Sequence, residues 1–389
     1  MYNFKGYPKD GEHPETFGNL AGGYNSLLYG TTMWGGNSPN CSSAGYNGCG
    51  TVFTVDTNAD VHHHYPEKIL YSFNGADGQF PWGTLWFDIS NPQNIWGTTG
   101  GGGTLGGWGT VFELTPDKKG NYKEHFLYSF GGPNDGATPY GGVVQDRQGN
   151  VYGTTAGGGT ESAGVIFEID GGGNEYVLHS MNGTTDGYGP MGGLVIDGNA
   201  NLYGVAYGAG DMNACNGSGC GTVFEVANGG KFSVLYRFKG GLDGQAPEGG
   251  LTIDGSGNLF GTTQYGGSQG GGTIFEITNK GKYKQLFSFG TGDSPLSAMW
   301  LDESGNLYGS TPSGGYYNEG YAFELDRKGN FTDMYDWGAS NRGGAMYGPT
   351  GGPIVLNNIY YLAGTGGDGS TSCDSPPSVC GAVVMLTPK

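Results

Sequence analysis

The sequence predicts an all-β fold, a seven-bladed β-propeller with four antiparallel strands in each blade. Three observations predict it: one motif recurs along the whole chain, each copy contains four strand-like segments, and the two chain ends supply complementary parts of one copy. A repeat of this kind has to be interpreted before any single residue, because it decides the fold.

The repeat is visible in three segments. Residues 306–325 read NLYGSTPSGGYYNEGYAFEL, and closely similar stretches begin at Asn150 (NVYGTTAGGGTESAGVIFEI) and at Asn258 (NLFGTTQYGGSQGGGTIFEI). The aromatic residue of the YGTT-like element occurs seven times, roughly 48 to 67 residues apart, at Tyr29, Trp96, Tyr152, Tyr203, Phe260, Tyr308 and Tyr361. This period is typical of propeller blades, whereas a parallel β-helix would repeat at a shorter one. We therefore expect residues 1–389 to form a single propeller domain.

Each repeat contains four strand candidates. An inner segment such as GGLTID is followed by NLFGTT, then by GTIFEI, and last by an outer segment such as YKQLFSF. Turn sequences such as DGSGN and DRQGN separate the first two segments. Short β-branched and aromatic runs bounded by turns favour strands, and four antiparallel strands per repeat are typical of a propeller blade.

The chain ends predict how the ring closes. The last repeat stops at VVMLTPK, after its third strand, and so lacks an outer strand, while the opening MYNFKG matches the outer segment LYSFNG at Leu70. We expect Tyr2 to Phe4 to lie beside Val383 to Leu386 and to complete the last blade. Closure would remove the exposed sheet edges that an open array would leave.

Composition and charge narrow the possible partners. The 389 residues include 84 Gly and 18 Pro, and 13% aromatic residues provide material for a packed core. A formal charge of -18 with only 17 Lys and Arg argues against nucleic acid and anionic membrane surfaces, and disfavours polyanionic substrates. No apolar run is long enough to span a membrane, and the opening residues lack the features of a signal peptide, so an exported form would have lost its signal.

All six cysteines fall into three close pairs, Cys41/Cys49, Cys215/Cys220 and Cys373/Cys380. The second member of each pair precedes a Gly that opens a strand, so one position of the repeat is used three times. A zinc site needs four converging ligands, and three separated pairs therefore favour local disulfides. Disulfides predict an oxidising compartment, and the protein is expected to be secreted, periplasmic or on the cell surface.

The repeat unit YGTT…GTVFEL…YSF.G..DG..P.GGL resembles the Gly-rich secreted tandem repeat called GloVer, over essentially the whole chain. The resemblance implies export and tandem repetition. The family has no assigned activity, so the resemblance supplies no catalytic residues.

Several acidic residues recur at equivalent positions and are interpreted as structural, because five equivalent carboxylates cannot all be catalytic. They are expected to accept hydrogen bonds in strands and turns. Their recurrence leaves structural calcium open, although no spaced D-x-D-x-DG loop is present, and no other cofactor or metal is expected. The three sets are Glu113, Glu168, Glu225, Glu276 and Glu324; Asp88, Asp146, Asp197, Asp254 and Asp302; and Asp77, Asp135, Asp186 and Asp243.

One face of the predicted ring carries residues that depart from the repeat. The loop from strand two to three and the connection from strand four to the next blade must lie on the same side, and these are the long loops. The residue after the loop Pro varies while its neighbours repeat: Glu15, Trp82, Tyr140, Met191, Glu248, Leu296 and Thr350. Nearby loops add Trp34, Tyr207, Asp211, Tyr265 and Tyr316, together with His13, Arg342 and Tyr347.

Aromatic rings interleaved with carboxylates, amides and an Arg around a central funnel suit a sugar chain, because rings cover the apolar sugar faces and polar groups fix the hydroxyls. We expect a monomer that takes a neutral polysaccharide or oligosaccharide. The leading hypothesis is a glycoside hydrolase, which needs a protonated carboxylic acid and a second carboxylate roughly 5 to 10 Å apart. Glu248 is the first candidate, with Asp211 from the adjacent blade or Glu15 across the funnel as its partner.

Two alternatives remain open. A polysaccharide lyase would use His13 or a Tyr as base and Arg342 against a uronate. A non-catalytic glycan-binding or cell-surface interaction module would keep equivalent pockets in several blades, whereas an enzyme would concentrate its departures at one central site. No G-x-S-x-G, H-E-x-x-H, P-loop or dinucleotide motif is evident.

Overall fold

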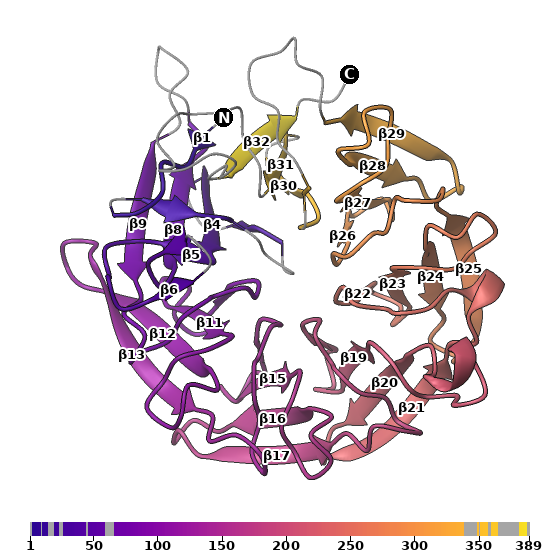
Figure 1. Cartoon of the computed structure of the whole chain (residues 1–389), viewed down its shortest axis with the longest axis horizontal. Coiled ribbons are helices and arrows are strands. Elements are labelled where there is room, and N and C mark those ends of the chain that lie inside the picture. Colours follow the sequence, from indigo (N-terminus) through magenta and orange to yellow (C-terminus); the bar gives the residue numbers. More distant parts are fainter. Residues whose placement is uncertain are drawn as a thin grey trace.

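The computed structural model is a closed ring of seven four-stranded antiparallel sheets around a central axis (Figure 1). It describes residues 2–8, 10–14, 19–22, 26–43, 46–58, 66–337, 348–349, 351–356, 359–364 and 381–386. The predicted seven-bladed propeller is confirmed. The helical turns within the described residues are short 3-10 segments, namely η2 (Cys215–Gly217), η3 (Gly241–Asp243) and a turn that includes Ser26.

The first three blades have their strands in chain order from the axis outward. Blade 1 contains β3 (Ala21–Gly22), β4 (Leu27–Thr32), β8 (Thr51–Asp56) and β9 (Glu67–Ser72). Blade 2 contains β10 (Trp86–Phe87), β11 (Ile95–Thr99), β12 (Thr110–Pro116) and β13 (Tyr122–Ser129). Blade 3 contains β14 (Val144–Gln145), β15 (Val151–Thr155), β16 (Val165–Ile169) and β17 (Glu175–Ser180).

The next three blades follow the same order. Blade 4 contains β18 (Val195–Ile196), β19 (Leu202–Ala206), β20 (Thr222–Ala227) and β21 (Lys231–Arg237). Blade 5 contains β22 (Thr252–Ile253), β23 (Leu259–Thr263), β24 (Thr273–Ile277) and β25 (Tyr283–Ser288). Blade 6 contains β26 (Trp300–Leu301), β27 (Leu307–Thr311), β28 (Tyr321–Leu325) and β29 (Phe331–Asp336).

Blade 7 joins the two ends of the chain. It contains β30 (Ile354–Leu356), β31 (Ile359–Gly364), β32 (Ala382–Leu386) and, as its outer strand, β1 (Tyr2–Asn3). Tyr2 pairs with Val383, and the amide of Phe4 donates to the Gly381 carbonyl at 3.1 Å. The predicted closure by the N-terminal strand is confirmed. Two small two-stranded sheets lie in loops next to blade 1. One pairs β2 (Gly11–Glu12) with β5 (Trp34–Gly35), and the other is the hairpin of β6 (Ser42–Ser43) and β7 (Tyr46–Asn47).

The glycine of the YGTT-like element is required by close packing within the blade. Gly97 on β11 pairs with Phe112 on β12, and a Cβ added to Gly97 would lie 2.5 Å from the Phe112 ring. The same Gly and Phe face one another in blades 3 to 6. The ring of the third strand therefore occupies the space that a side chain on the second strand would need.

Aromatic rings also join each blade to the next. Phe73, which follows β9, is fully buried and meets Phe112 of blade 2 edge-on, with ring centroids 5.1 Å apart. Equivalent pairs are Phe4 with Phe53, Phe130 with Phe167, Phe238 with Phe275, and Phe289 with Phe323. The core therefore runs around the ring through the seams between blades.

The inner segments meet backbone to backbone around the axis. A Cβ on Gly83 would lie 2.5 Å from the Gly142 nitrogen, and a Cβ on Gly141 would lie 2.8 Å from the Gly192 carbonyl carbon. The hydroxyl of Thr98 donates to the Gly141 carbonyl at 2.8 Å, which ties the second strand of blade 2 to the inner segment of blade 3. The glycines that follow the loop Pro in blades 2 and 3 are therefore required by contact between neighbouring blades.

Two of the three predicted disulfides, Cys41–Cys49 and Cys215–Cys220, are confirmed. Cys373 and Cys380 lie outside the described residues. Both confirmed disulfides are in loops between the second and third strands of their blades, and each packs on a glycine of the following interblade connection, Gly75 and Gly240 respectively. They therefore fasten neighbouring loops of one face.

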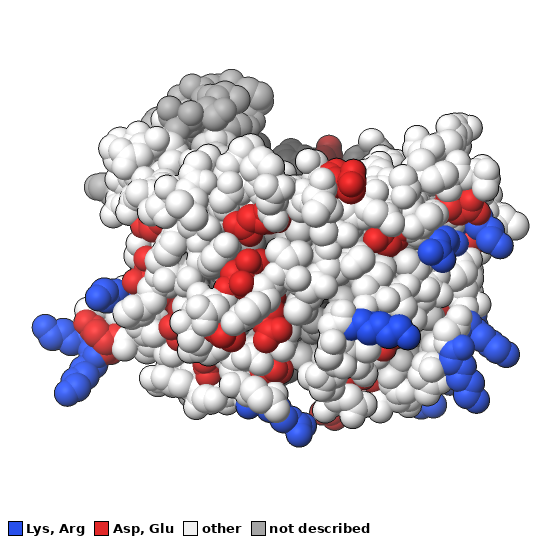
Figure 2. All heavy atoms as spheres, turned by 90° about the horizontal axis from the view of Figure 1, so that it is seen from below, with Lys and Arg blue, Asp and Glu red and all other residues white. Residues whose placement is uncertain are grey.

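The ring has two different faces. The upper face is formed by the loops from strand two to strand three and by the connections between blades, for example 207–221 and 238–251, and the base is formed by the remaining hairpins. In the edge-on view of Figure 2, most of the basic side chains lie in the lower half of the molecule. Most described Lys and Arg residues lie in base hairpins or at the adjoining ends of outer strands: Lys68, Lys118, Lys119, Lys123, Arg147, Lys231, Lys280, Lys282, Lys284, Arg327 and Lys328.

Candidate functional site

A sharp turn holds one side chain from each of blades 2 to 6 on the upper face of the ring. The residue before each loop Pro has a positive φ, for example 58° at Thr138 and 56° at Ala246. The Pro then packs on the Gly that opens the preceding third strand, since a Cβ on Gly109 would lie 2.6 Å from Pro139 Cδ. The residue after the Pro is therefore held in an equivalent place in successive blades. We call the described members the mouth residues: Trp82, Tyr140, Met191, Glu248 and Leu296, all half-buried.

Two mouth residues form an aromatic platform. The rings of Trp82 and Tyr140, from blades 2 and 3, stack with centroids 4.4 Å apart and planes 10° apart. Burial raises the pKa of Tyr140, so this phenol stays neutral. Because the rings cover one another, each offers only its other face to a ligand.

Glu248 lies on blade 5 near Tyr207. Burial raises the pKa of its carboxyl, which therefore keeps a proton at a higher pH than an ordinary Glu does. Burial also raises the pKa of Tyr207, and the charge of Glu248 together with the neighbouring Tyr265 and Tyr188 raises it further. The centroids of the Tyr188 and Tyr207 rings are 6.2 Å apart. A partly buried acid beside phenols is a group that can donate a proton.

The predicted partners of Glu248 are placed less favourably or lie beyond the described residues. Asp211 is half-buried, and its carboxylate accepts the Asn213 amide at 3.0 Å within its own loop. Within the described part of the chain, no hydrogen bond joins Asp211 to Glu248. Glu15 lies outside the described residues, as do Arg342 and Tyr347.

The other predicted binding residues occupy different depths. Trp34 on β5 is buried, only 6% exposed, and meets Phe80 edge-on at 4.5 Å. His13 has a φ of 52°, and its carbonyl accepts the Met33 amide at 2.9 Å. Tyr265 is 40% exposed, and Tyr316 is 85% exposed with its ring edge-on to Tyr317. Trp34 is therefore part of the wall of blade 1, whereas Tyr265 and Tyr316 are open to solvent.

The upper face also exposes apolar side chains that sequence reasoning did not select. Leu105, Trp108, Met212 and Leu242 are each more than 40% exposed in upper loops. Tyr188 was missed as well, although it stands where Gln79, Ala137 and Gln245 stand in other repeats, each paired with a loop of the following blade. An alignment of these bridge positions, rather than of the mouth positions alone, would have found it.

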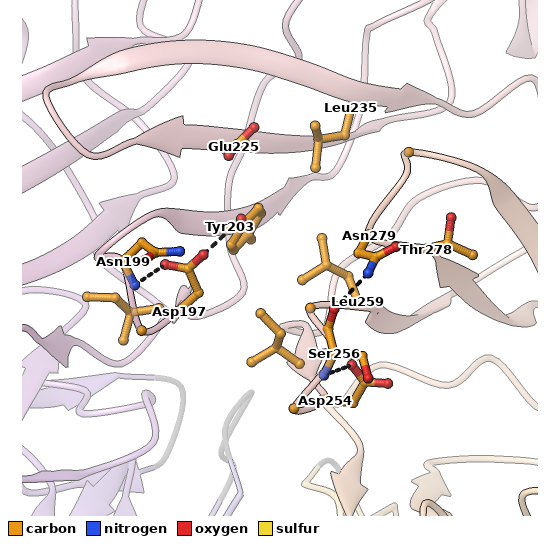
Figure 3. A pocket seen from close by; sticks show the side chains of 16 residues that line it. Asp197, Asn199, Tyr203, Glu225, Leu235, Asp254, Ser256, Leu259, Thr278 and Asn279 are labelled. Carbon is orange, nitrogen blue, oxygen red and sulfur yellow. Dashed lines mark hydrogen bonds between the residues drawn. The ribbon is translucent and has the colours of Figure 1, made fainter.

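The base has wide grooves, whereas the axis is narrow. The cavity along the axis measures about 170 Å³ and is lined by residues that directly precede the inner strands, such as Val143, Leu194 and Met299. Three grooves at the base, under the seams of blades 3 and 4, 4 and 5, and 5 and 6, measure about 740, 630 and 680 Å³. Equivalent hairpins line them, and Figure 3 shows the groove between blades 4 and 5.

The described residues contain neither a metal-binding cluster nor a helix that could cross a membrane. No group of three or more His, Cys, Asp or Glu side chains is arranged there to hold a metal ion. No helix in this part of the chain has the length and apolarity needed to cross a membrane.

Comparison with solved structures finds other propellers at low identity. A candidate 6-phosphogluconolactonase from Bacteroides uniformis is 14% identical with a TM-score of 0.52, over 85% of this chain and 86% of that one. A puromycin hydrolase mutant is 12% identical with a TM-score of 0.54, over 94% of this chain and 53% of that one. PorZ, a surface component of the Porphyromonas gingivalis type-IX secretion system, is 12% identical with a TM-score of 0.53, over 92% of this chain and 46% of that one. At these identities the likeness shows a shared fold alone.

Sequence comparison identifies the repeat itself. No curated protein matches the chain significantly. The model of the Gloeobacter/Verrucomicrobia repeat matches residues 1–217 and 214–373. These matches cover far more than half of the sequence and include the YGTT and GTVFEL elements that build the blades, and the chain therefore belongs to the Gloeobacter/Verrucomicrobia repeat family.

Proposed function

We propose that this chain is a secreted, carbohydrate-active protein that hydrolyses a neutral polysaccharide or oligosaccharide at the upper opening of the ring, with Glu248 as general acid. One observation carries the proposal. Glu248 is the single carboxyl among the five described mouth residues, and burial raises its pKa. Protonation of a glycosidic oxygen needs an acid of this kind.

The polar and aromatic side chains of the upper face favour a saccharide over other ligands. The Trp82–Tyr140 platform offers flat apolar faces to sugar rings, while the Tyr207 and Tyr265 hydroxyls can bond to sugar hydroxyls. Few described cations lie on this face, so a neutral chain suits it better than an anionic one. Asp211 and Glu15 remain the proposed second carboxylate. The two disulfides support a secreted protein, because such bonds persist in oxidising compartments.

The first test is release of reducing ends from a panel of neutral polysaccharides, with absorbance of unsaturated products followed in the same assays. We expect Glu248→Gln to lower kcat by roughly 100-fold or more, since general acid catalysis typically contributes that much. Glu161→Gln is the matched control, because Glu161 is an exposed carboxylate of an upper loop and should be dispensable. Full activity in the Glu248 variant would exclude its role, and unsaturated products would favour a lyase.

A non-catalytic glycan-binding module is the second candidate, favoured by the three similar base grooves, since binding modules keep equivalent pockets in several blades. It predicts retention on immobilised glycans without product release. In that case Trp82→Ala should weaken retention when the upper opening binds the glycan, and should leave it unchanged when the base grooves do.

A further inference from the structure

The groove between blades 4 and 5 is a built cavity at the base, on the face opposite Glu248. It measures about 630 Å³, and its lining includes the half-buried Leu235 of blade 4 and Leu259 of blade 5, which is only 2% exposed. Figure 3 shows these side chains with Tyr203 and Glu225 of blade 4 around the same space. The groove thus combines an apolar surface, an aromatic ring and a carboxylate.

Most polar groups of this groove are used by the fold. Asp197 accepts the amides of Asn199 and Asn201 at 2.8 and 2.9 Å, and Asp254 does the same for Ser256 and Asn258, both at 2.8 Å. Glu225 differs, because it accepts no hydrogen bond from any residue that the structure describes. Its cross-strand neighbour, Ser233, carries no charge.

The charged residues that line the groove are all acidic. Its lining includes Asp197, Glu225 and Asp254 but no Lys or Arg, and the lysines of the 278–282 turn do not line it. Burial alone would raise the pKa of Asp197, but amide hydrogen bonds from Asn201 and Asn199 lower it, so this carboxylate is ionised at neutral pH. A cationic ligand would offset the charge of these carboxylates.

The next groove, between blades 5 and 6, provides a natural comparison. It has the same hairpins and the equivalent carboxylate, Glu276, but Lys284 stands in the cross-strand position and pairs with Glu276 at 3.7 Å. Arg327 and Lys328 also line that groove. The two grooves therefore share their shape and differ in whether the central carboxylate already has a cation.

We propose that the groove between blades 4 and 5 binds an alkylammonium group. The ammonium would lie beside Glu225 with the Tyr203 ring as a second, cation–π partner, and the alkyl part would pack on Leu235. A polyamine and a lysine side chain of another protein both present this chemistry. The site is independent of the saccharide function proposed for the upper opening.

Calorimetric titration of the full chain with n-butylammonium, and with n-butanol as the neutral analogue, tests the proposal. We expect the cation to bind and the alcohol not to bind. Glu225→Gln should weaken binding roughly tenfold, which is what loss of one charge-assisted hydrogen bond produces. Glu276→Gln, in the neighbouring groove, should leave binding unchanged. Titrations with spermidine and with N-acetyl-lysine methylamide then distinguish a polyamine from a protein lysine by which binds more tightly.

A second variant keeps the test valid if Glu225→Gln destabilises the fold. Ser233→Lys leaves Glu225 in place but sets a lysine opposite it, as Lys284 stands opposite Glu276. It should abolish binding of n-butylammonium while the thermal unfolding midpoint stays near that of the parent. Equal binding of butanol and butylammonium, binding that survives Ser233→Lys, or an equal loss in Glu276→Gln would each overturn the proposal.

Discussion

At the scale of single residues, the Gly of the second strand and the Phe of the third strand pack against one another in blades 2 to 6. The ring of Phe112 lies across Gly97, which leaves no room for a Cβ, and the same pair recurs in blades 3 to 6. The G of YGTT and the F of GTVFEL are thus two halves of one packing contact. This explains why they recur together although they lie more than ten residues apart.

Gly97→Ala should lower the free energy of unfolding by about 2 kcal/mol, because a methyl group inserted into a packed core forces its neighbours apart. Chemical denaturation of the parent and of the variant measures this difference in the free energy of unfolding. The matched control is Gly171→Ala, since Gly171 is exposed and a Cβ there would meet nothing within 4 Å. A loss of stability as large in the control as in Gly97→Ala would show that packing against Phe112 is not the cause.

At the scale of strands, the seams between blades are of two kinds. In the acid seams, an Asp of the interblade connection, an outer-strand Tyr and a Glu from the next outer strand come together, as Asp77, Tyr71 and Glu124 do. Asp135, Tyr128 and Glu175 repeat this arrangement, as do Asp10, Tyr2 and Glu67. In later seams an aromatic ring replaces the Glu, for example Phe232 on His179 and Tyr283 on Tyr236.

The acid seams predict a stability that depends on pH. Burial and the neighbouring Asp raise the pKa of Glu124 and of Glu175 to about 7, and burial, with Asp10, raises that of Glu67 to about 8 even though Tyr2 and Lys5 oppose the shift. The folded chain therefore holds protons that the unfolded chain releases above about pH 4.5. These three carboxyl groups therefore contribute their full stabilisation below about pH 4.5, and this contribution is lost as the pH rises toward about 8.

We expect the thermal unfolding midpoint of the parent to fall between pH 5 and pH 8, and the triple variant with Gln at positions 67, 124 and 175 to show a smaller fall. The difference between the two curves isolates the three seams from other titrating groups. Parallel curves over this pH range would mean that the three carboxyls are ionised in the folded protein.

The sequence predicted the features within each blade but not the contacts between blades. The repeat predicted the strands, their order and the connection Asp residues as loop fasteners, because those features belong to one blade. The acid seams, the Glu225 groove and the Trp82–Tyr140 stack depend on pairs of residues from different blades, and a single repeat does not contain such pairs. Of the candidate active site, the mouth positions could be predicted, while the distance from Glu248 to a second carboxylate depends on loops that vary from blade to blade.

At the scale of the whole molecule, one residue links the closing strand to the first blade. Phe4 is fully buried and meets Phe53 of blade 1 edge-on at 4.9 Å, while its amide bonds to Gly381 of blade 7.

Phe4→Ala should lower the free energy of unfolding by about 3 kcal/mol through loss of buried surface and creation of a cavity. Phe126→Ala on an outer strand, where Phe126 is 38% exposed, should cost much less. Equal losses in denaturant titrations would mean that the seam at Phe4 adds no special stability.

The pairing of Tyr2 with Val383 also bears on synthesis. The residues around Tyr2 leave the ribosome long before Val383, so the opening strand remains an unpaired edge while the first six blades form. Such an edge attracts other growing chains. Crowded expression should therefore favour molecules that exchange their opening strands with one another, and dilution during refolding should favour the monomeric ring.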